Sequence, residues 1–153
     1  MKRRVLLLAG ASGLLACSAL RAREEPAPQE ALAPPPWRYE EFEWQDAARQ
    51  GEVPVRLYLP AQAPASPLPL VLFSHGIGGS RRGYSYIGQY LASQGFASLH
   101  VQHVGSDRKL WGGNVLQLAW RLQAAARSEE ARARAHDLRF ALDQLLTQRP
   151  GLV

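Results

Sequence analysis

The stretch LPLVLFSHGIGGSRRGYSYIGQYLASQGFASLHVQHVG, residues 68–105, decides the fold. Its apolar run at 70–73 has no polar alternation, which predicts a strand buried on both faces. The turn at 74–80 holds three glycines within four positions, so its backbone can take positive φ and approach a ligand closely. A helical pattern follows and ends at Gly95, and residues 96–101 predict a second strand. Strand, turn, helix and strand together predict a crossover between two parallel strands.

Residues 37–60, upstream of this stretch, predict a hairpin of antiparallel strands. Aromatic residues mark its first half, a polar turn lies at 46–51, and apolar residues alternate with others from Val53 to Leu59. The alternation predicts one buried face. Pro54 favours an edge strand or a strand start, because proline donates no hydrogen bond to a ladder.

Two helical patterns follow the second parallel strand. One begins at Asn114, and another has its apolar face at 138–145 and ends near Gln148, before Pro150. The polar stretch between them allows Glu130 and Arg134 to pair at i, i+4. Strands followed by a crossover and helices predict an α/β domain over residues 37–153.

The glycine-rich turn carries a family resemblance. The sequence from LVLFSHGIGG to HVQHVGSD resembles α/β-hydrolases of the dienelactone-hydrolase, chlorophyllase and platelet-activating-factor acetylhydrolase-like group, in which a strand ends in H-G-x-G. The resemblance runs from about Trp37 to the C-terminus and implies an α/β-hydrolase sheet with antiparallel opening strands. It also implies that Ile77, between Gly76 and Gly78, offers its backbone N–H as half of an oxyanion hole.

A serine hydrolase of this fold also needs a nucleophile, usually in G-x-S-x-G, followed by an acid and a histidine. Ser74 has only one of the two glycines and lies in the turn assigned to the oxyanion hole. Ser85 has Ile87 in place of the second glycine and no strand before it. The resemblance places the nucleophile strand after the helix that ends near Gln148, so we expect the whole triad beyond Val153. The chain is then an N-terminal fragment, truncated before the nucleophile, with no measurable esterase activity.

Other chemistries receive less support from the residues. His75 is either catalytic or, as we expect, fixed by hydrogen bonds beside the turn. His100 and His103 are three apart on a strand or its exit, which disfavours joint metal binding even with Asp107 nearby. The turn has Arg81 where G-x-G-x-x-G needs glycine, which disfavours a nucleotide site. No cofactor is predicted.

Several aromatic residues have two open interpretations. Tyr84, Tyr86 and Tyr90 could line an acyl pocket, although helical spacing favours core packing for Tyr86 and Tyr90. Trp111 and Trp120 either border a substrate cleft or are simply buried.

The N-terminal residues predict export. Residues 1–17 have a basic start and about a dozen largely apolar residues, which is typical of a signal peptide and too short to span a bilayer. Their ending, Leu-Leu-Ala-Cys, resembles a lipoprotein signal in which Cys17, the only cysteine, is acylated. The alternative is a plain signal peptide with an incidental cysteine. Residues 18–36 hold five prolines and predict an extended tether.

Net charge gives no case for nucleic acid. The formal charge of +5 falls to +2 once Lys2, Arg3 and Arg4 are removed with the signal, because 15 basic residues then face 13 acidic ones.

Two functions remain in competition. The first is the N-terminal part of a secreted, lipid-anchored serine hydrolase of the bacterial envelope, facing the periplasm from the outer membrane. Its partners are a small-molecule or lipid ester in the full-length parent and the membrane. The second is a non-catalytic envelope lipoprotein that uses the half-sheet as a binding module, which would leave the strand at 70–73 as an exposed apolar edge.

Overall fold

The computed structural model describes residues 34–62 and 67–153. The predicted signal peptide at 1–17, the predicted acylation site Cys17 and most of the predicted tether at 18–36 lie outside the described residues. The elements, in chain order, are β1 (Trp37–Asp46), β2 (Gly51–Pro60), β3 (Leu70–Ser74), α1 (Ser85–Ser93), β4 (Ala97–Val101), the 3₁₀ turns η1 (Arg108–Trp111) and η2 (Val115–Gln117), α2 (Leu118–Ala125) and α3 (Ser128–Gln148).

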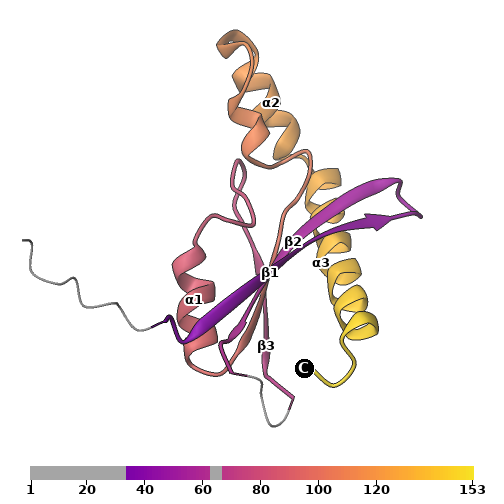
Figure 1. The fold of residues 1–153 in the computed structure, drawn as a ribbon. Helices are drawn as coiled ribbons and strands as arrows, with labels where there is room; N and C mark the ends of the chain where they lie inside the picture. Colours follow the sequence, from indigo (N-terminus) through magenta and orange to yellow (C-terminus); the bar gives the residue numbers. More distant parts are fainter. Residues whose placement is uncertain (1–33, 63–66) are drawn as a thin grey trace, which may run out of the picture. The chain divides into compact units, whose positions relative to one another are not determined.

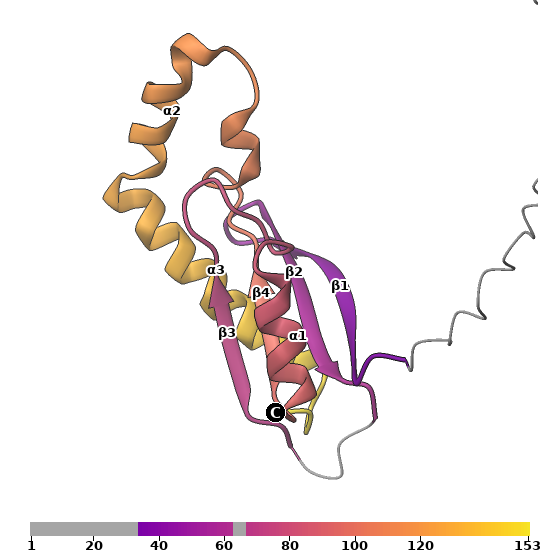
Figure 2. The same cartoon turned by 90° about the vertical axis from the view of Figure 1, so that its left-hand side faces the viewer.

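The four-stranded mixed sheet lies between α1 and α3 in Figure 1, and its strand order is β1-β2-β4-β3 (Figure 2). β1 pairs with β2 in antiparallel register, and β2 pairs antiparallel with β4, with Leu57 opposite Leu99. β3 and β4 are parallel, with Leu72 opposite Leu99. The predicted hairpin and the predicted parallel crossover are both confirmed, and the fold class is α/β as expected.

One face of the sheet packs against α3 through the apolar core, and α1 lies on the other face (Figure 2). The α3 side is filled by aliphatic residues of alternate strand positions together with two helix residues. They are Val53, Val55, Leu57, Leu59, Ala97, Leu99, Val101, Ala141 and Leu145, with Trp44 at the margin. Each large aliphatic side chain buried this way contributes roughly 1.5–3 kcal/mol.

Helix α1 packs closely on β2 because a glycine faces the sheet. A Cβ at Gly88 would lie 2.3 Å from the Tyr58 ring, and Tyr58 is fully buried beneath the helix. Gly95 has φ of +86° and ends the helix as predicted, with the Phe96 amide donating to the Leu91 carbonyl.

Three expectations about packing were wrong. Tyr86 and Tyr90 are each 65% exposed, because the sheet-facing side of α1 consists of small residues instead. β2 is buried on both faces, because α1 packs on the face that the alternation had predicted to be exposed to solvent. Pro54 lies in an inner strand, because β2 is between β1 and β4. β3 forms a sheet edge within the described residues, and Leu72 is 37% exposed rather than buried on both faces.

The C-terminal helices differ from the sequence pattern in extent. The region after Asn114 is a 3₁₀ turn followed by the short α2, and α3 includes the polar stretch that was expected to separate two helices. Arg134 donates to residues of the glycine-rich turn rather than serving the predicted pair with Glu130. None of the helices in the described part is long and apolar enough to cross a membrane.

Candidate active site

The glycine-rich turn begins where β3 ends and is held by backbone hydrogen bonds. The Gly78 amide donates to the Ser106 carbonyl at 2.8 Å, and the Gly79 amide donates to the Gly76 carbonyl at 3.0 Å. Gly78 has φ of +77°, and a Cβ there would lie 2.4 Å from the Trp111 indole. That indole also donates to the Gly78 carbonyl at 2.9 Å. Only glycine fits at position 78, which explains this part of the motif.

The backbone amide of Ile77 has different surroundings from the amides of Gly78 and Gly79. Across residues 34–62 and 67–153, no acceptor bonds to the Ile77 N–H, and the residue is 42% exposed. A side chain at Gly76 would meet nothing within 4 Å, so the backbone before Ile77 borders open space. An unbonded N–H beside open space is a donor that a substrate oxygen can reach.

His75 lies beneath the turn and is fixed by two hydrogen bonds. Its Nδ1 bonds the Gly76 carbonyl at 2.7 Å, and its Nε2 accepts from the His103 amide at 3.1 Å. The residue is 1% exposed, and burial lowers the pKa of its imidazole. A neutral ring bonded on both nitrogens holds the turn, as the sequence favoured for His75.

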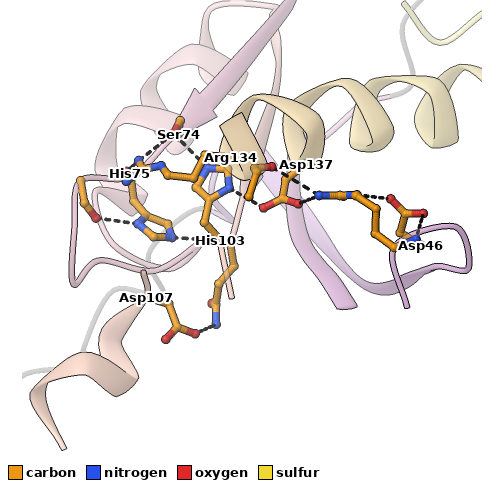
Figure 3. A network of polar contacts seen from close by, with 11 residues as sticks. Asp46, Ser74, His75, His103, Asp107, Arg134 and Asp137 are labelled. Carbon is orange, nitrogen blue, oxygen red and sulfur yellow. Dashed lines mark hydrogen bonds and ion pairs between the residues drawn. The ribbon is translucent and has the colours of Figure 1, made fainter. Parts of the chain in front are cut away.

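A chain of three polar side chains runs from the end of β3 to α3 (Figure 3). Ser74 Oγ lies 2.9 Å from His103 Nε2, and His103 Nδ1 lies 2.9 Å from Asp137 Oδ2. His103 is 1% exposed and Asp137 is 8% exposed, whereas Ser74 is exposed. Serine, histidine and aspartate are therefore hydrogen-bonded in the order that nucleophilic catalysis requires.

Two arginines complete this polar chain at its ends. Arg134 of α3 donates to Ser74 Oγ at 3.0 Å and to the His75 carbonyl. Arg49, in the hairpin turn, donates to Asp137 Oδ1 at 2.7 Å and to Asp46 at 2.5 Å. The Arg49 guanidinium also holds the pKa of Asp46 below its ordinary value. This series of hydrogen-bonded side chains thus connects the hairpin, α3 and the glycine-rich turn.

A cavity of about 390 Å³ opens where β3 ends beside the junction of α2 and α3. Ser74 and Ile77 line one side of it, and the opposite side is mostly small and apolar. The remaining lining residues are Ala125, Ala126, Arg127, Ala131, Arg134, Ala135 and Leu138. The residue with the exposed hydroxyl and the residue with the unbonded amide therefore border the same cavity.

A second set of ion pairs connects the far end of the turn to the hairpin. Arg81 is 8% exposed, donates to the carbonyls of Phe42 and Val55, and pairs with Glu43. Arg82 pairs with Glu41 at 2.8 Å. Arg81 thus has a structural role, where a nucleotide motif would need glycine.

The remaining candidate residues have structural contacts. His100 lies between the rings of Tyr58 and Phe73, away from His103, and Asp107 caps η1 by accepting from the Lys109 amide. In the part of the chain with described coordinates, no three His, Cys, Asp or Glu residues lie together as metal ligands would.

The aromatic residues near the turn are not part of the core. Trp111 and Trp120 are 57% and 65% exposed, so simple burial is the wrong interpretation for both. Tyr84 is 54% exposed, at the start of α1, and its ring lies 5.8 Å from that of Phe73.

Sequence reasoning missed His103, Asp137 and Arg134 as site residues. Asp137 and Arg134 lie in a helical stretch rich in arginine and alanine, where no motif marks them. The spacing of Arg134 and Asp137, three apart on one helix, was the one available signal that both could face the same neighbour.

Comparison with known proteins shows which family the central part of the chain resembles. Residues 46–109 match the family described as platelet-activating factor acetylhydrolase, isoform II. This part of the chain is an α/β-hydrolase relative. No curated protein matches the chain. The matched range contains β2, β3, α1, β4 and the whole glycine-rich turn, whereas the site residues of α3, Arg134 and Asp137, lie outside it.

A solved esterase shares the fold over part of its length. A ferulic acid esterase from Streptomyces cinnamoneus matches with a TM-score of 0.57 and 24% identity, over 76% of this chain and 48% of the esterase. A dienelactone hydrolase from Anabaena variabilis matches with a TM-score of 0.46 and 20% identity, over 71% and 45% of the two chains. The chain thus spans less than half the length of these enzymes.

Proposed function

We propose that this chain supplies the oxyanion-hole part of a serine hydrolase that acts on carboxylic esters. The observation that carries the proposal is the unbonded Ile77 N–H, in a residue that lines a cavity and is followed by two hydrogen-bonded amides, those of Gly78 and Gly79. The relationship to hydrolases supports it. In this function the Ile77 N–H donates to the carbonyl oxygen as negative charge develops in the transition state.

The nucleophile of that hydrolase is proposed to lie in a segment other than these 153 residues. No serine of the chain occupies a G-x-S-x-G motif. Sequencing of the coding DNA past the Val153 codon, in all three frames, tests this point. A G-x-S-x-G motif within about thirty residues is the expected finding, and its absence would contradict the proposed source of the nucleophile.

The role of the Ile77 amide is tested by removing its hydrogen in a chain that includes such a motif. Ile77→Pro removes the N–H and is expected to lower kcat about 100- to 1,000-fold with little change in KM. Ile77→Ala keeps the N–H and removes most of the side chain, so it should retain kcat within a few-fold. Equal losses in both variants would show that the side chain, and not the amide, matters.

Export and anchoring form a separate part of the proposal. The basic and apolar start and the Leu-Leu-Ala-Cys ending support an acylated Cys17 that holds the protein at the outer membrane, facing the periplasm. Mass spectrometry of the mature protein should find acyl chains on Cys17. Cys17→Ser should release the protein from the membrane fraction, and an unmodified N-terminus would contradict the anchor.

A further inference from the structure

The serine–histidine–aspartate chain at the end of β3 has no role in the proposed hydrolase, whose nucleophile lies elsewhere. We propose that Ser74 is itself an acyl-acceptor serine, activated by His103 and Asp137 to react with activated carboxylic esters and organophosphonates. This inference goes beyond the proposed function and does not depend on it.

The hydrogen bonds define where the protons lie. The Asp137 carboxylate accepts from Arg49 on one oxygen, so its other oxygen can accept the Nδ1 proton of His103. His103 Nε2 then has its lone pair free to accept the Ser74 hydroxyl proton at 2.9 Å. Because both ring nitrogens are bonded and the ring is buried, its orientation is fixed. A general base within hydrogen-bond reach of a hydroxyl is the geometry of an activated nucleophile.

The hydroxyl is also accessible and faces a positive charge. Ser74 is exposed and lines the cavity of about 390 Å³ beside α3, so an electrophile can reach Oγ without displacing the core. The Arg134 guanidinium, 3.0 Å from Oγ, stabilises negative charge as the hydroxyl proton leaves. Ile77 borders the same cavity and has an unbonded amide that can face the substrate oxygen.

The chemical step balances without any further reactant. Ser74 Oγ attacks the carbonyl carbon and forms a new C–O bond while its proton moves to His103 Nε2. The tetrahedral intermediate then breaks its bond to the leaving alcohol, which takes the proton from Nε2. The products are an acyl-Ser74 ester and the free alcohol. With a fluorophosphonate, the same attack on phosphorus releases fluoride.

The geometry predicts acylation without efficient turnover. Hydrolysis of the acyl-serine requires a water molecule activated by His103 Nε2. That nitrogen lies behind Ser74 Oγ and the ring is 1% exposed, so the attached acyl group covers the base. A short p-nitrophenyl ester should therefore release at most about one equivalent of nitrophenolate per chain in a burst, followed by no steady-state rate above the blank.

The experiment is covalent labelling of the intact 153-residue protein with a fluorophosphonate, followed by peptide mass spectrometry. Ser74 is expected to carry the label, and Ser74→Ala should abolish it. Ser85→Ala, which removes the other serine with a partial motif, should leave labelling unchanged. His103→Gln should slow labelling about 100-fold or more, and Asp137→Asn at least about tenfold. Asp143→Asn, on the same helix but in a distant exposed pair with Arg139, is the matched control.

The outcomes separate this inference from the proposed function. Absence of label on Ser74, or label on another serine that persists in Ser74→Ala, would overturn the inference and leave the Ile77 role intact. Steady-state ester turnover that disappears in Ser74→Ala would support Ser74 as a nucleophile, but it would contradict both the predicted lack of turnover and the proposed source of the hydrolase nucleophile. If His103→Gln fails to fold by circular dichroism, the comparison of the parent with Ser74→Ala still decides, because Ser74 is on the surface.

Discussion

The sheet face that packs against α3 and the face that packs against α1 are built from different side chains. Along β4, Ala97, Leu99 and Val101 join the apolar core, whereas Ser98 and His100 alternate with them on the other side. Both sets are fully buried. The same strand therefore presents an aliphatic surface to one helix and a polar surface to the other.

The difference shows how each face is stabilised. The α3 face gains free energy from apolar area removed from water, which depends little on pH or salt. The α1 face buries the His100 imidazole, which bonds no acceptor or donor among the described residues, between the rings of Tyr58 and Phe73. Arg56 and Arg81 border that face and pair with Glu41. The stability of packing on the α1 face must therefore depend on the protonation states of His100 and Glu41.

The largest expected effect is on the α3 face. Leu145→Ala removes a fully buried side chain from the core and should lower the free energy of unfolding by about 2–5 kcal/mol, measured by urea denaturation. Leu146→Ala is the matched control, because Leu146 is the next residue of α3 and its side chain is 45% exposed. This substitution should change the free energy of unfolding by less than about 0.5 kcal/mol. Equal effects would mean that α3 does not pack on the sheet as described.

The α1 face should lose stability as the pH falls. Burial, with a smaller contribution from Arg56, lowers the pKa of His100 from 6.5 to about 4. The folded state thus favours the neutral ring. Its stabilising effect is complete above pH 6.5 and is lost as pH falls from 6.5 toward 4. This shift in pKa corresponds to roughly 3 kcal/mol. His75, whose pKa is also lowered by burial, acts in the same direction.

A variant without the ring isolates this effect. His100→Phe removes the titrating group and should flatten the fall in melting temperature between pH 6.5 and pH 4. His136→Gln replaces an exposed histidine of α3 and should keep the fall seen in the parent. If the two variants behave alike, His100 is not the group that sets the acid sensitivity.

Local patterns in the sequence predicted the hairpin, the crossover and the glycine-rich turn. Each of these depends on neighbouring residues: alternation in β2, the apolar run of β3, and Gly95 as a helix end. The side chains that meet at the site could not be predicted in this way. Ser74 ends β3, His103 lies in the loop after β4, and Asp137 is on α3, so only the parallel pairing of β3 with β4 and the packing of α3 bring them together.

The wrong burial predictions have a common physical cause. Periodicity showed that Tyr86 and Tyr90 share a helix face, but it could not show which face the sheet would contact. The closeness of α1 to Tyr58 required Gly88, so small residues face the sheet and the tyrosines face outward. Likewise, Pro54 suggested an edge because sequence alone could not place β4 beside β2.

Close packing on the α1 face is tested at that glycine. Gly88→Ala places a Cβ 2.3 Å from a buried aromatic ring, so it should destabilise the protein by about 1–3 kcal/mol despite the better helix propensity of alanine. Thermal unfolding measures this loss. In the background of Tyr58→Leu the same substitution should have a smaller effect, because the ring that it strikes is gone. An unchanged effect in that background would indicate a backbone cause.

The smallest expected effect is on the ionic border of the α1 face. Hydrogen bonds from Arg82, then Arg56, lower the pKa of Glu41 from 4.5 to about 2, so its contribution is complete above pH 4.5 and is lost as pH falls toward 2. Since the group is partly exposed, solvent screening limits the contribution to about 1 kcal/mol. Glu41→Gln should reduce stability by about that amount at pH 7 and by almost nothing at pH 2. This acid window lies below that of His100, so the separation would be contradicted if Glu41→Gln and His100→Phe lost their effects over the same pH range.

Sodium chloride at 1 M should halve the effect of Glu41→Gln at pH 7 and leave the loss in Leu145→Ala unchanged, because salt screens exposed charges and does not weaken apolar burial.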